Sequence, residues 1–578
     1  MIKKLIKSVR EYKRDSLLAP IFITLEVIME VIIPYLMAEL IDKGIDNGNM
    51  NYILKMGIIL AISCVISLTF GALSGKYAAS ASAGFAKNLR KDMFYNVQNF
   101  SFSNIDKFST SSIVTRLTTD VTNVQNAYQM IIRVAVRSPL MLIFSMVMAF
   151  GINHRLSLIY LGAVPILGVG LYLIATHAHP IFERVFKIYD KLNNVVQENL
   201  HGIRVVKSYV REDYEEKKFK DVSQDIYGNF VKAEKLIAFN SPLMQFAAYG
   251  CMLLISWFGA KFIVSSTMTT GELTSLISYT MQILMSLMML SMIFVMVIMA
   301  RASAERIVEI LVEDSDLKNP ENPVYEIKNG DISFRNVNFG YSKKKRDKLC
   351  LKNINIDIKS GETVGIIGGT GSSKSSLVQL IPRLYDTLDG EVLVGGRNVK
   401  EYDIKALRDE VAMVLQKNVL FSGTIKENLR WGNDQASDEE LVRVCRLAQA
   451  DEFIQTFPNK YDTHIEQGGS NVSGGQKQRL CIARALLKKP KILILDDSTS
   501  AVDTKTDASI RRAFREEIPD TTKIIIAQRI SSVEDADKII VMDNGSINGI
   551  GTHEELLKSN EIYREVYSSQ VKGGGDDE

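Results

Sequence analysis

TVGIIGGTGSSKSSLVQLI, residues 363–381, joins a short apolar run, a glycine-rich stretch and a second apolar segment at helical spacing. The middle nearly matches G-x-x-x-x-G-K-[ST], a loop that cradles phosphates between a strand and a helix. Gly368, Lys374 and Ser375 match the pattern, and Ser373 stands at its second glycine. A dinucleotide fingerprint fails, because its third glycine would fall on Lys374. The stretch therefore predicts a nucleotide-binding loop, with a chance match as the alternative.

The whole chain divides into two halves of different composition. It has 578 residues, of which 46% are hydrophobic and 23% charged, with a net charge of +3. Residues 16–300 carry long apolar runs, whereas residues 301–578 resemble a soluble domain. The near-neutral charge argues against a nucleic-acid partner. The five cysteines lack C-x-x-C spacing, which argues against a zinc site or a disulfide framework.

The apolar half holds six candidate membrane spans, each near the ~20 residues that a bilayer requires. They cover roughly 16–41, 54–78, 137–152, 157–178, 243–266 and 273–300. The long connections after the second and fourth spans are rich in Lys and Arg. The positive-inside bias therefore places the N-terminus, both connections and the soluble half in the cytoplasm. Both connections also hold apolar positions at helical spacing, so we expect the membrane helices to continue into them.

The first residues predict a helix that lies on the membrane surface. Residues 1–14 place apolar side chains on one helical face and Lys or Arg elsewhere; a solvated basic tail is the alternative. We expect an interfacial helix at 1–15, a membrane domain at 16–310, a linker at 311–330, a soluble domain at 331–570 and a flexible tail at 571–578.

Two features of the spans are candidates for a substrate pathway. Glu26 and Glu30 are four residues apart and share one helical face. A charge at bilayer depth costs about 2.5–3.5 kcal/mol and therefore faces a cavity or a partner; an ion pair inside the bundle is the alternative. A methionine stripe on the sixth span offers a pliable apolar wall, with lipid contact or helix packing as the alternative. It comprises Met281, Met285, Met288, Met289, Met292, Met296 and Met299.

The soluble half adds an acidic strand end to the glycine-rich loop. Residues 491–497 read KILILDD, an apolar strand that ends in two carboxylates. Asp496 stands where a magnesium-organising aspartate belongs, and Ser375 supplies the matching hydroxyl. The alternation of strand-like and helix-like segments predicts an α/β domain.

At this point the chain resembles the ATP-binding cassette (ABC) family. The family's signature, usually L-S-G-G-Q, is similar to Val472, Ser473, Gly474, Gly475 and Gln476. Its glutamine loop matches VLQKNVLFSGTIKENL with Gln416, its adenine-stacking tyrosine matches NVNFGYS with Tyr341, and its D-loop matches Ser500, Ala501, Val502 and Asp503. The segments STSSIVTRLTTDV and ENLHGIRVVKSYVRED are similar to the coupling loops of the exporter-type membrane domain. The resemblance implies a six-helix membrane domain followed by an α/β nucleotide-binding domain.

The resemblance also implies a role for each motif. The loop residues Gly368, Gly369, Thr370, Gly371, Ser372, Ser373, Lys374, Ser375 and Ser376 would hold the phosphates of ATP. Ser375, Gln416 and Asp496 would hold Mg²⁺, and Tyr341 would stack on adenine. The signature would contact ATP that is held by a second subunit, so one membrane half plus one cassette implies a dimer.

Three residues depart from the family pattern, and all lie on the chain's own nucleotide face. Ser373 replaces a glycine, at a cost of about 1 kcal/mol if the backbone must adopt a glycine conformation. Asp497 replaces the glutamate that polarises the attacking water, and Gln528 replaces a switch histidine. The signature differs only at Val472.

This asymmetry resembles the degenerate-site subunit of heterodimeric bacterial multidrug ABC exporters. We expect a subunit that moves a small-molecule or peptide substrate outward, with slow hydrolysis at its own site and an intact signature for its partner. The alternatives are a homodimeric exporter with Asp497 as a slow base, an ATP-dependent membrane regulator that transports nothing, and an importer on the same fold.

Overall fold

The computed structural model describes residues 1–341, 349–497 and 502–572. Contacts between Cα atoms divide the chain into two compact units. One unit comprises 1–99 and 109–313, and the other comprises 100–108 together with the residues from 314 onward.

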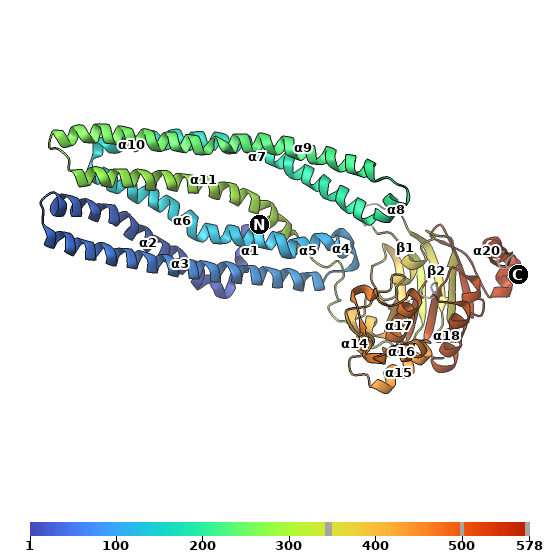
Figure 1. The fold of residues 1–578 in the computed structure, drawn as a ribbon. Coiled ribbons are helices and arrows are strands. Elements are labelled where there is room, and N and C mark those ends of the chain that lie inside the picture. Colours follow the sequence, from blue (N-terminus) through green and yellow to red (C-terminus); the bar gives the residue numbers. More distant parts are fainter. Residues whose placement is uncertain (342–348, 498–501, 573–578) are drawn as a thin grey trace. The chain divides into compact units, whose positions relative to one another are not determined.

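The first unit is entirely helical, and its main elements are long rods (Figure 1). The long helices are α2 (Lys13–Glu39), α3 (Met50–Gln98), α6 (Val121–Ile152), α7 (His154–His201), α9 (Glu212–Ala238), α10 (Asn240–Val264) and α11 (Thr270–Val312), and the short ones are α1 (Ile2–Lys7), α5 (Thr110–Thr115) and α8 (Ile203–Ser208). Among the residues that the structure describes, six helices are long and apolar enough to cross a membrane. The prediction of six membrane helices is therefore confirmed.

Several of these helices are much longer than a bilayer is thick. At 1.5 Å per residue, the 49 residues of α3 span about 74 Å, against about 30 Å of hydrocarbon. The third predicted span, 137–152, is the end of the longer helix α6, which begins at Val121. The residues of α6 before 137 come from the long connection after the second span, into which the sequence predicts that the membrane helices continue.

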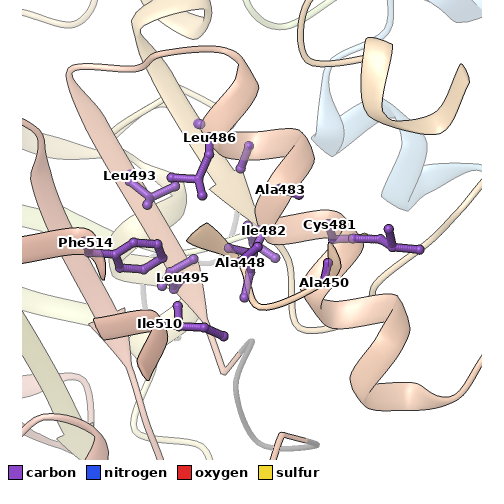
Figure 2. Close-up of a cluster of buried hydrophobic side chains, with 14 of the residues drawn as sticks. Ala448, Ala450, Cys481, Ile482, Ala483, Leu486, Leu493, Leu495, Ile510 and Phe514 are labelled. Atoms are coloured by element: carbon purple, nitrogen blue, oxygen red, sulfur yellow. The ribbon is translucent and has the colours of Figure 1, made fainter. Parts of the chain in front are cut away.

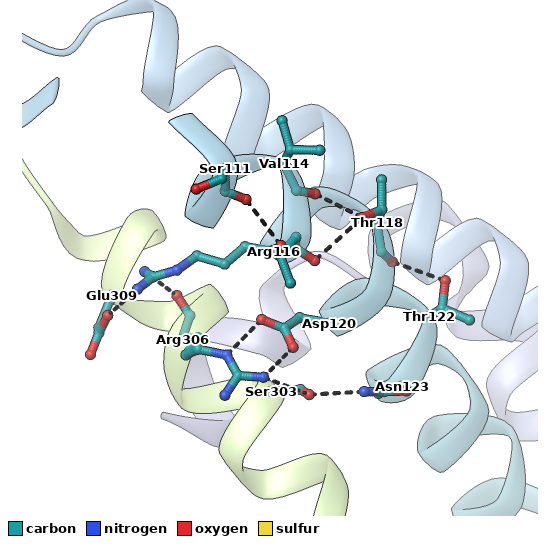
Figure 3. A network of polar contacts seen from close by, with 11 residues as sticks. Ser111, Val114, Arg116, Thr118, Asp120, Thr122, Asn123, Ser303, Arg306 and Glu309 are labelled. Carbon is teal, nitrogen blue, oxygen red and sulfur yellow. Dashed lines mark hydrogen bonds and ion pairs between the residues drawn. The ribbon is translucent and has the colours of Figure 1, made fainter. Parts of the chain in front are cut away.

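A polar network joins α11 to the start of α6 (Figure 3). Asp120 is almost fully buried and accepts a hydrogen bond of 2.7 Å from Nε of Arg306. Arg116 donates to the carbonyl oxygen of Arg306 at 2.9 Å and pairs with Glu309 at 2.8 Å. Asp120 and Arg116 bound a short π-helix, η3 (Arg116–Asp120). The network therefore anchors the last turns of α11 shortly before the chain enters the second unit.

The second unit contains two larger sheets and a set of shorter helices. The central sheet has the order β12-β11-β3-β10-β9-β6, and a second sheet has the order β2-β1-β4-β5. The strands are β1 (Ile332–Phe339), β2 (Leu351–Ile358), β3 (Thr363–Gly368), β4 (Asp389–Val394), β5 (Arg397–Asn398), β6 (Val411–Val414), β9 (Ile492–Asp496), β10 (Thr522–Ile526), β11 (Lys538–Asp543) and β12 (Ser546–Gly551), with β7 (Gly423–Thr424) paired to β8 (His464–Ile465). In the central sheet β11, β3, β10, β9 and β6 run parallel, and β12 is antiparallel to β11.

Helices cover the central sheet and bury its strands. The main helices of this unit are α12 (Lys374–Gln379), α13 (Ile404–Glu410), α14 (Ile425–Arg430), α15 (Asp438–Leu447), α16 (Asp451–Thr456), α17 (Gly474–Leu487), α18 (Thr504–Glu517), α19 (His553–Ser559) and α20 (Glu561–Lys572). Figure 2 shows Leu493 and Leu495 of β9 beside Ile482 of α17 and Phe514 of α18. All five residues of β9 are buried, as expected for a parallel strand covered on both faces. This core fixes the strand ends that carry the candidate site.

One short helix from the first part of the chain belongs to the second unit. α4 (Phe102–Lys107) carries Asp106, which accepts a hydrogen bond of 2.7 Å from the hydroxyl of Tyr385. The ring of Phe102 meets the ring of Tyr385 edge-on, with 6.0 Å between centroids. Residues 100–108 therefore pack with the second unit, although they precede most of it in the sequence by more than 200 residues.

Candidate functional site

The candidate site forms where parallel strands of the central sheet end side by side. The ladder aligns Ile526 of β10 with Ile366 of β3 and with Asp496 of β9. The glycine-rich loop, the two carboxylates and Gln528 follow these strand ends directly. In open α/β sheets, ligands bind outside the carboxyl ends of the strands. The glycine-rich loop, the two carboxylates and Gln528 thus lie together at the edge of the sheet where a ligand site is expected.

The glycine-rich loop curls around its own lysine. Nζ of Lys374 donates to the carbonyl oxygens of Gly368 and Gly369 at 2.8 and 2.9 Å, and to Oγ of Ser372 at 3.3 Å. A Cβ at Gly368 would come within 2.2 Å of the carbonyl oxygen of Met542, so only glycine fits there. Burial lowers the pKa of Lys374, and the nearby carboxylates of Asp497 and Asp496 oppose that shift.

Ser373 adopts the conformation for which glycine is normally selected. Its φ of 72° and ψ of 25° lie in the left-handed region, directly before α12 begins at Lys374. For a residue with a Cβ this conformation costs about 1–2 kcal/mol. The serine therefore keeps the shape of the loop under backbone strain.

Oxygen ligands for a magnesium ion come from two neighbouring elements. Oγ of Ser375, on α12, donates to Oδ1 of Asp496 at 2.9 Å. A hydroxyl beside a carboxylate suits Mg²⁺, which takes few protein ligands and completes its shell with water and phosphate oxygens. The amide of Gln416 instead contacts Asp497, at 3.3 Å.

Burial raises the pKa of Asp496, and the charge of Asp497 raises it further, while the hydrogen bond from Ser375 lowers it. A raised pKa means that the folded chain favours the protonated carboxyl, so this contribution to stability is lost as the pH rises through the folded-state pKa. At neutral pH, Asp496→Asn is therefore expected to raise the melting temperature of the nucleotide-free chain and to abolish the further rise that Mg²⁺-ATP produces. Thermal unfolding of both forms checks this, with the exposed Asp434→Asn as control; a lower melting temperature without nucleotide would contradict it.

Asp497 is held by two amide side chains. Its Oδ2 accepts hydrogen bonds from Nε2 of Gln528 at 2.7 Å and from Nε2 of Gln416 at 3.3 Å. Its backbone is left-handed, with a φ of 48°, a conformation that aspartate tolerates better than most residues. Asp497 and Gln528, which depart from the family pattern separately in the sequence, form one hydrogen-bonded pair in the structure.

Tyr341 lies beside the loop with its ring half exposed. Its hydroxyl is 2.8 Å from Oγ of Ser376, and its ring meets those of Phe339 and Tyr385 edge-on. Because half of Tyr341 is exposed, part of its aromatic surface is accessible for stacking. Residues 342–348, which follow Tyr341, lie outside the described residues.

The signature begins a different helix. Ser473 caps α17: its Oγ accepts from the N–H of Gln476 at 3.3 Å, and its own N–H donates to Oε1 of Gln476 at 2.9 Å. Ser473 and Gly474 are exposed, whereas Val472 and Gly475 are half-buried. Exposed backbone donors at a helix start can bind an anion. Ser473 and Gly474 therefore leave the start of α17 accessible to solvent.

The D-loop residue Asp503 caps α18, because its Oδ1 accepts from the N–H of Thr506 at 2.9 Å. Val502 is buried. Ser500 and Ala501 lie outside the described residues.

The two membrane carboxylates share one guanidinium that the sequence analysis did not identify. Arg137 of α6 forms ion pairs with Glu26 and, at 2.7 Å, with Glu30. Oε2 of Glu26 is buried and has no hydrogen-bond partner among the described residues. Arg137 was missed because it stood at the predicted start of the third span. Its position on a polar face of the extended α6 could have identified it.

The methionine stripe lies along a largely exposed face of α11. Met281, Met285, Met289 and Met292 are exposed, and Met288 and Met296 are half-buried. The side chain of Met299 lies outside the described residues. The stripe lies on one face of α11, and the buried Ile283 lies on the opposite face.

Comparisons with known proteins agree over nearly the whole chain. Residues 16–300 match the family model described as the ABC transporter transmembrane region, and residues 351–500 match the model described as ABC transporter. An uncharacterized ABC transporter ATP-binding protein of Bacillus subtilis, YfiB, is 37% identical over 90% of each chain. An ATP-dependent lipid A-core flippase of Desulfotalea psychrophila is 30% identical over 89% of this chain and 90% of its own.

The fold matches a solved structure of the same architecture. A bacterial Atm1-family ABC exporter with ATP bound superposes with a TM-score of 0.84, over 97% of this chain and 99% of its own, at 23% identity. The nucleotide-binding motifs, the six membrane helices and the relatives together identify the chain as a member of the ABC transporter family, with a membrane domain and an ATP-binding domain fused in one half-transporter.

Proposed function

We propose that this chain is the degenerate-site subunit of a heterodimeric exporter. In this proposal its own site binds Mg²⁺-ATP and hydrolyses it slowly, and its signature completes the catalytic site of the partner subunit. The N-terminus and the nucleotide-binding unit lie in the cytoplasm, as the Lys- and Arg-rich connections indicate.

The observation that carries the proposal is that the carboxylate of Asp497 accepts hydrogen bonds from two amide side chains. A general base must reach the proton that it removes. Asp497 is one methylene shorter than the glutamate of the family pattern, and Gln528 and Gln416 both donate to one of its oxygens. Gln528 is neutral and cannot supply the charge of a protonated histidine. This arrangement favours holding ATP over activating water.

The remaining residues support binding without fast hydrolysis. Lys374 and Ser375 are present in a loop of the expected shape, and Mg²⁺ held by Ser375 and Asp496 would neutralise phosphate charge. Ser473 and Gly474 are exposed at the start of α17, where a partner's phosphate can reach them.

The proposal is tested with two variants of this chain in the reconstituted heterodimer. Ser473→Ala is expected to lower ATP hydrolysis about tenfold or more, because a hydrogen bond to a charged group contributes roughly 1.5–3 kcal/mol. Asp497→Asn is expected to change hydrolysis by less than about twofold, since turnover occurs at the other site. Ser470→Ala, at an exposed serine of the same loop, is the control. Comparable losses for Asp497→Asn and Ser473→Ala would contradict the asymmetry and favour a homodimer-like transporter.

We further propose that Glu26, Glu30 and the methionine stripe border the substrate pathway, and that the substrate is an amphipathic or cationic small molecule. Two carboxylates against one guanidinium leave a net negative charge, and one oxygen of Glu26 has no partner among the described residues. Exposed methionines can adapt to molecules of different shape.

A further inference from the structure

The loop that carries Gln528 is held by a side chain from α20. Nε2 of Gln570 donates to the carbonyl oxygen of Gln528 at 2.8 Å, and Oε1 of Gln570 accepts from the N–H of Ile530 at 2.9 Å. One amide therefore satisfies a backbone acceptor and a backbone donor two residues apart. Only a side chain with both groups at this length can do so: asparagine is one methylene shorter, and glutamate lacks the donor.

The same loop is held on its other side by α18. Oγ of Ser532 donates to Oδ2 of Asp507 at 2.9 Å, and Asp507 is nearly fully buried. Arg511 also donates to that carboxylate, at 3.3 Å, and pairs with Asp535 beyond the loop. Residues 528–532 are therefore fixed at both ends, by Gln570 at the first and by Asp507 at the last.

These contacts decide where the side chain of Gln528 points. Its backbone carbonyl is bound to Gln570, and its amide donates to Asp497 at 2.7 Å. Gln528 occupies the position that the ABC resemblance assigns to contact with the terminal phosphate of ATP. Loss of the Gln570 contacts would free the backbone of Gln528 while leaving the glycine-rich loop untouched.

We propose that Gln570 is a positioning residue of the nucleotide site: it holds Gln528 against Asp497, so that the site distinguishes ATP from ADP. The inference rests on the proposed function, in which this site retains ATP rather than turning it over. It adds α20 to the elements that set the nucleotide response of the chain.

The test measures Kd values of Mg²⁺-ATP and Mg²⁺-ADP for the full-length chain in lipid nanodiscs. Gln570→Ala is expected to weaken ATP binding about three- to tenfold, the range for loss of one to two hydrogen bonds, and to leave ADP binding within about twofold. In a Gln528→Ala background the same substitution is expected to have no further effect on the ratio. Ser569→Ala is the matched control, since its hydroxyl donates within α20, to the carbonyl of Val566.

Hydrogen exchange supplies a readout that does not depend on nucleotide. The amides of 528–530 are expected to exchange faster in Gln570→Ala, with the amides of 369–375 unchanged. Three outcomes would each overturn the positioning role. The ratio of the Kd values for ATP and ADP could stay unchanged in Gln570→Ala, or both nucleotides could lose affinity equally while the melting temperature falls. Gln570→Ala could also change that ratio as much in the Gln528→Ala background as in the unmodified chain. Hydrogen exchange is measured without nucleotide and therefore without turnover, so a chain that proved fully hydrolytic would refute the proposed function and leave this readout interpretable.

Discussion

Replacing Asp497 by Glu together with Gln528 by His is expected to raise ATP hydrolysis by the full-length chain about 100-fold. A misplacement of about 1 Å at a catalytic group can cost about 10²-fold, and one methylene is a displacement of that size. The double variant restores both the reach of the carboxylate and a side chain that can carry charge. The measurement is steady-state ATPase activity of the purified chain in lipid nanodiscs.

Neither single substitution is expected to suffice, because the two residues contact each other. With Asp497→Glu alone, the amide of Gln528 remains beside the longer carboxylate and can still donate to it. With Gln528→His alone, the imidazole faces a carboxylate that does not reach the water. We therefore expect less than about tenfold from each single variant, a non-additivity typical of residues in contact.

Lys374→Ala in the doubly substituted chain is the control that ties the gained activity to this loop. It should abolish the gain, since Lys374 would supply the positive charge that meets the phosphates of ATP. If Asp497→Glu alone equals the double variant, the contact between Asp497 and Gln528 does not restrain the site. If the unmodified chain already hydrolyses ATP as fast as the double variant, the site is not degenerate.

The parts of the site that lie within one contiguous segment of the sequence could be predicted from the sequence. The glycine-rich loop, Asp496 and the signature are contiguous motifs, and each was placed on its element from sequence alone. The left-handed conformation of Ser373 also follows locally, because the pattern assigns its position to glycine.

Contacts between distant segments could not be predicted in this way. The bond between Asp497 and Gln528 depends on β9 and β10 being parallel neighbours in register. Gln570 lies 42 residues from Gln528, on an exposed helical surface where a glutamine is unremarkable. Arg137 can be placed on a polar face of α6 from the sequence, but its pairing with Glu26 and Glu30 of α2 cannot. In each case the missing information is which segments pack together, which spacing within one segment does not contain.

Arg137→Ala is expected to destabilise the membrane domain by about 3 kcal/mol. The substitution leaves Glu26 and Glu30 at bilayer depth without their cation, and one uncompensated charge there costs about 2.5–3.5 kcal/mol on insertion scales. Breaking a buried pair costs about 3–5 kcal/mol, and the lower end applies here because Arg137 and Glu30 are each about one-third exposed. Reversible unfolding by SDS in mixed micelles measures the loss.

Two further variants separate the ion pairs from a role in transport. The triple variant Arg137→Met, Glu26→Gln, Glu30→Gln removes all three charges of this ion cluster. It is expected to regain most of the stability that Arg137→Ala loses, since neutral groups can replace an ion cluster at little cost. Glu26→Gln with Glu30→Gln leaves Arg137 unpaired; Arg137 can extend its charge toward water, so the expected loss of stability is smaller than for Arg137→Ala. If that double variant folds and still exports cationic substrates at the unmodified rate, the carboxylates serve only as anchors for α2 and α6, and the proposed pathway must lie elsewhere. If it folds and loses export of cations while retaining ATP binding, the carboxylates bind the substrate during transport. Arg137 then pairs with Glu26 and Glu30 when no substrate is bound.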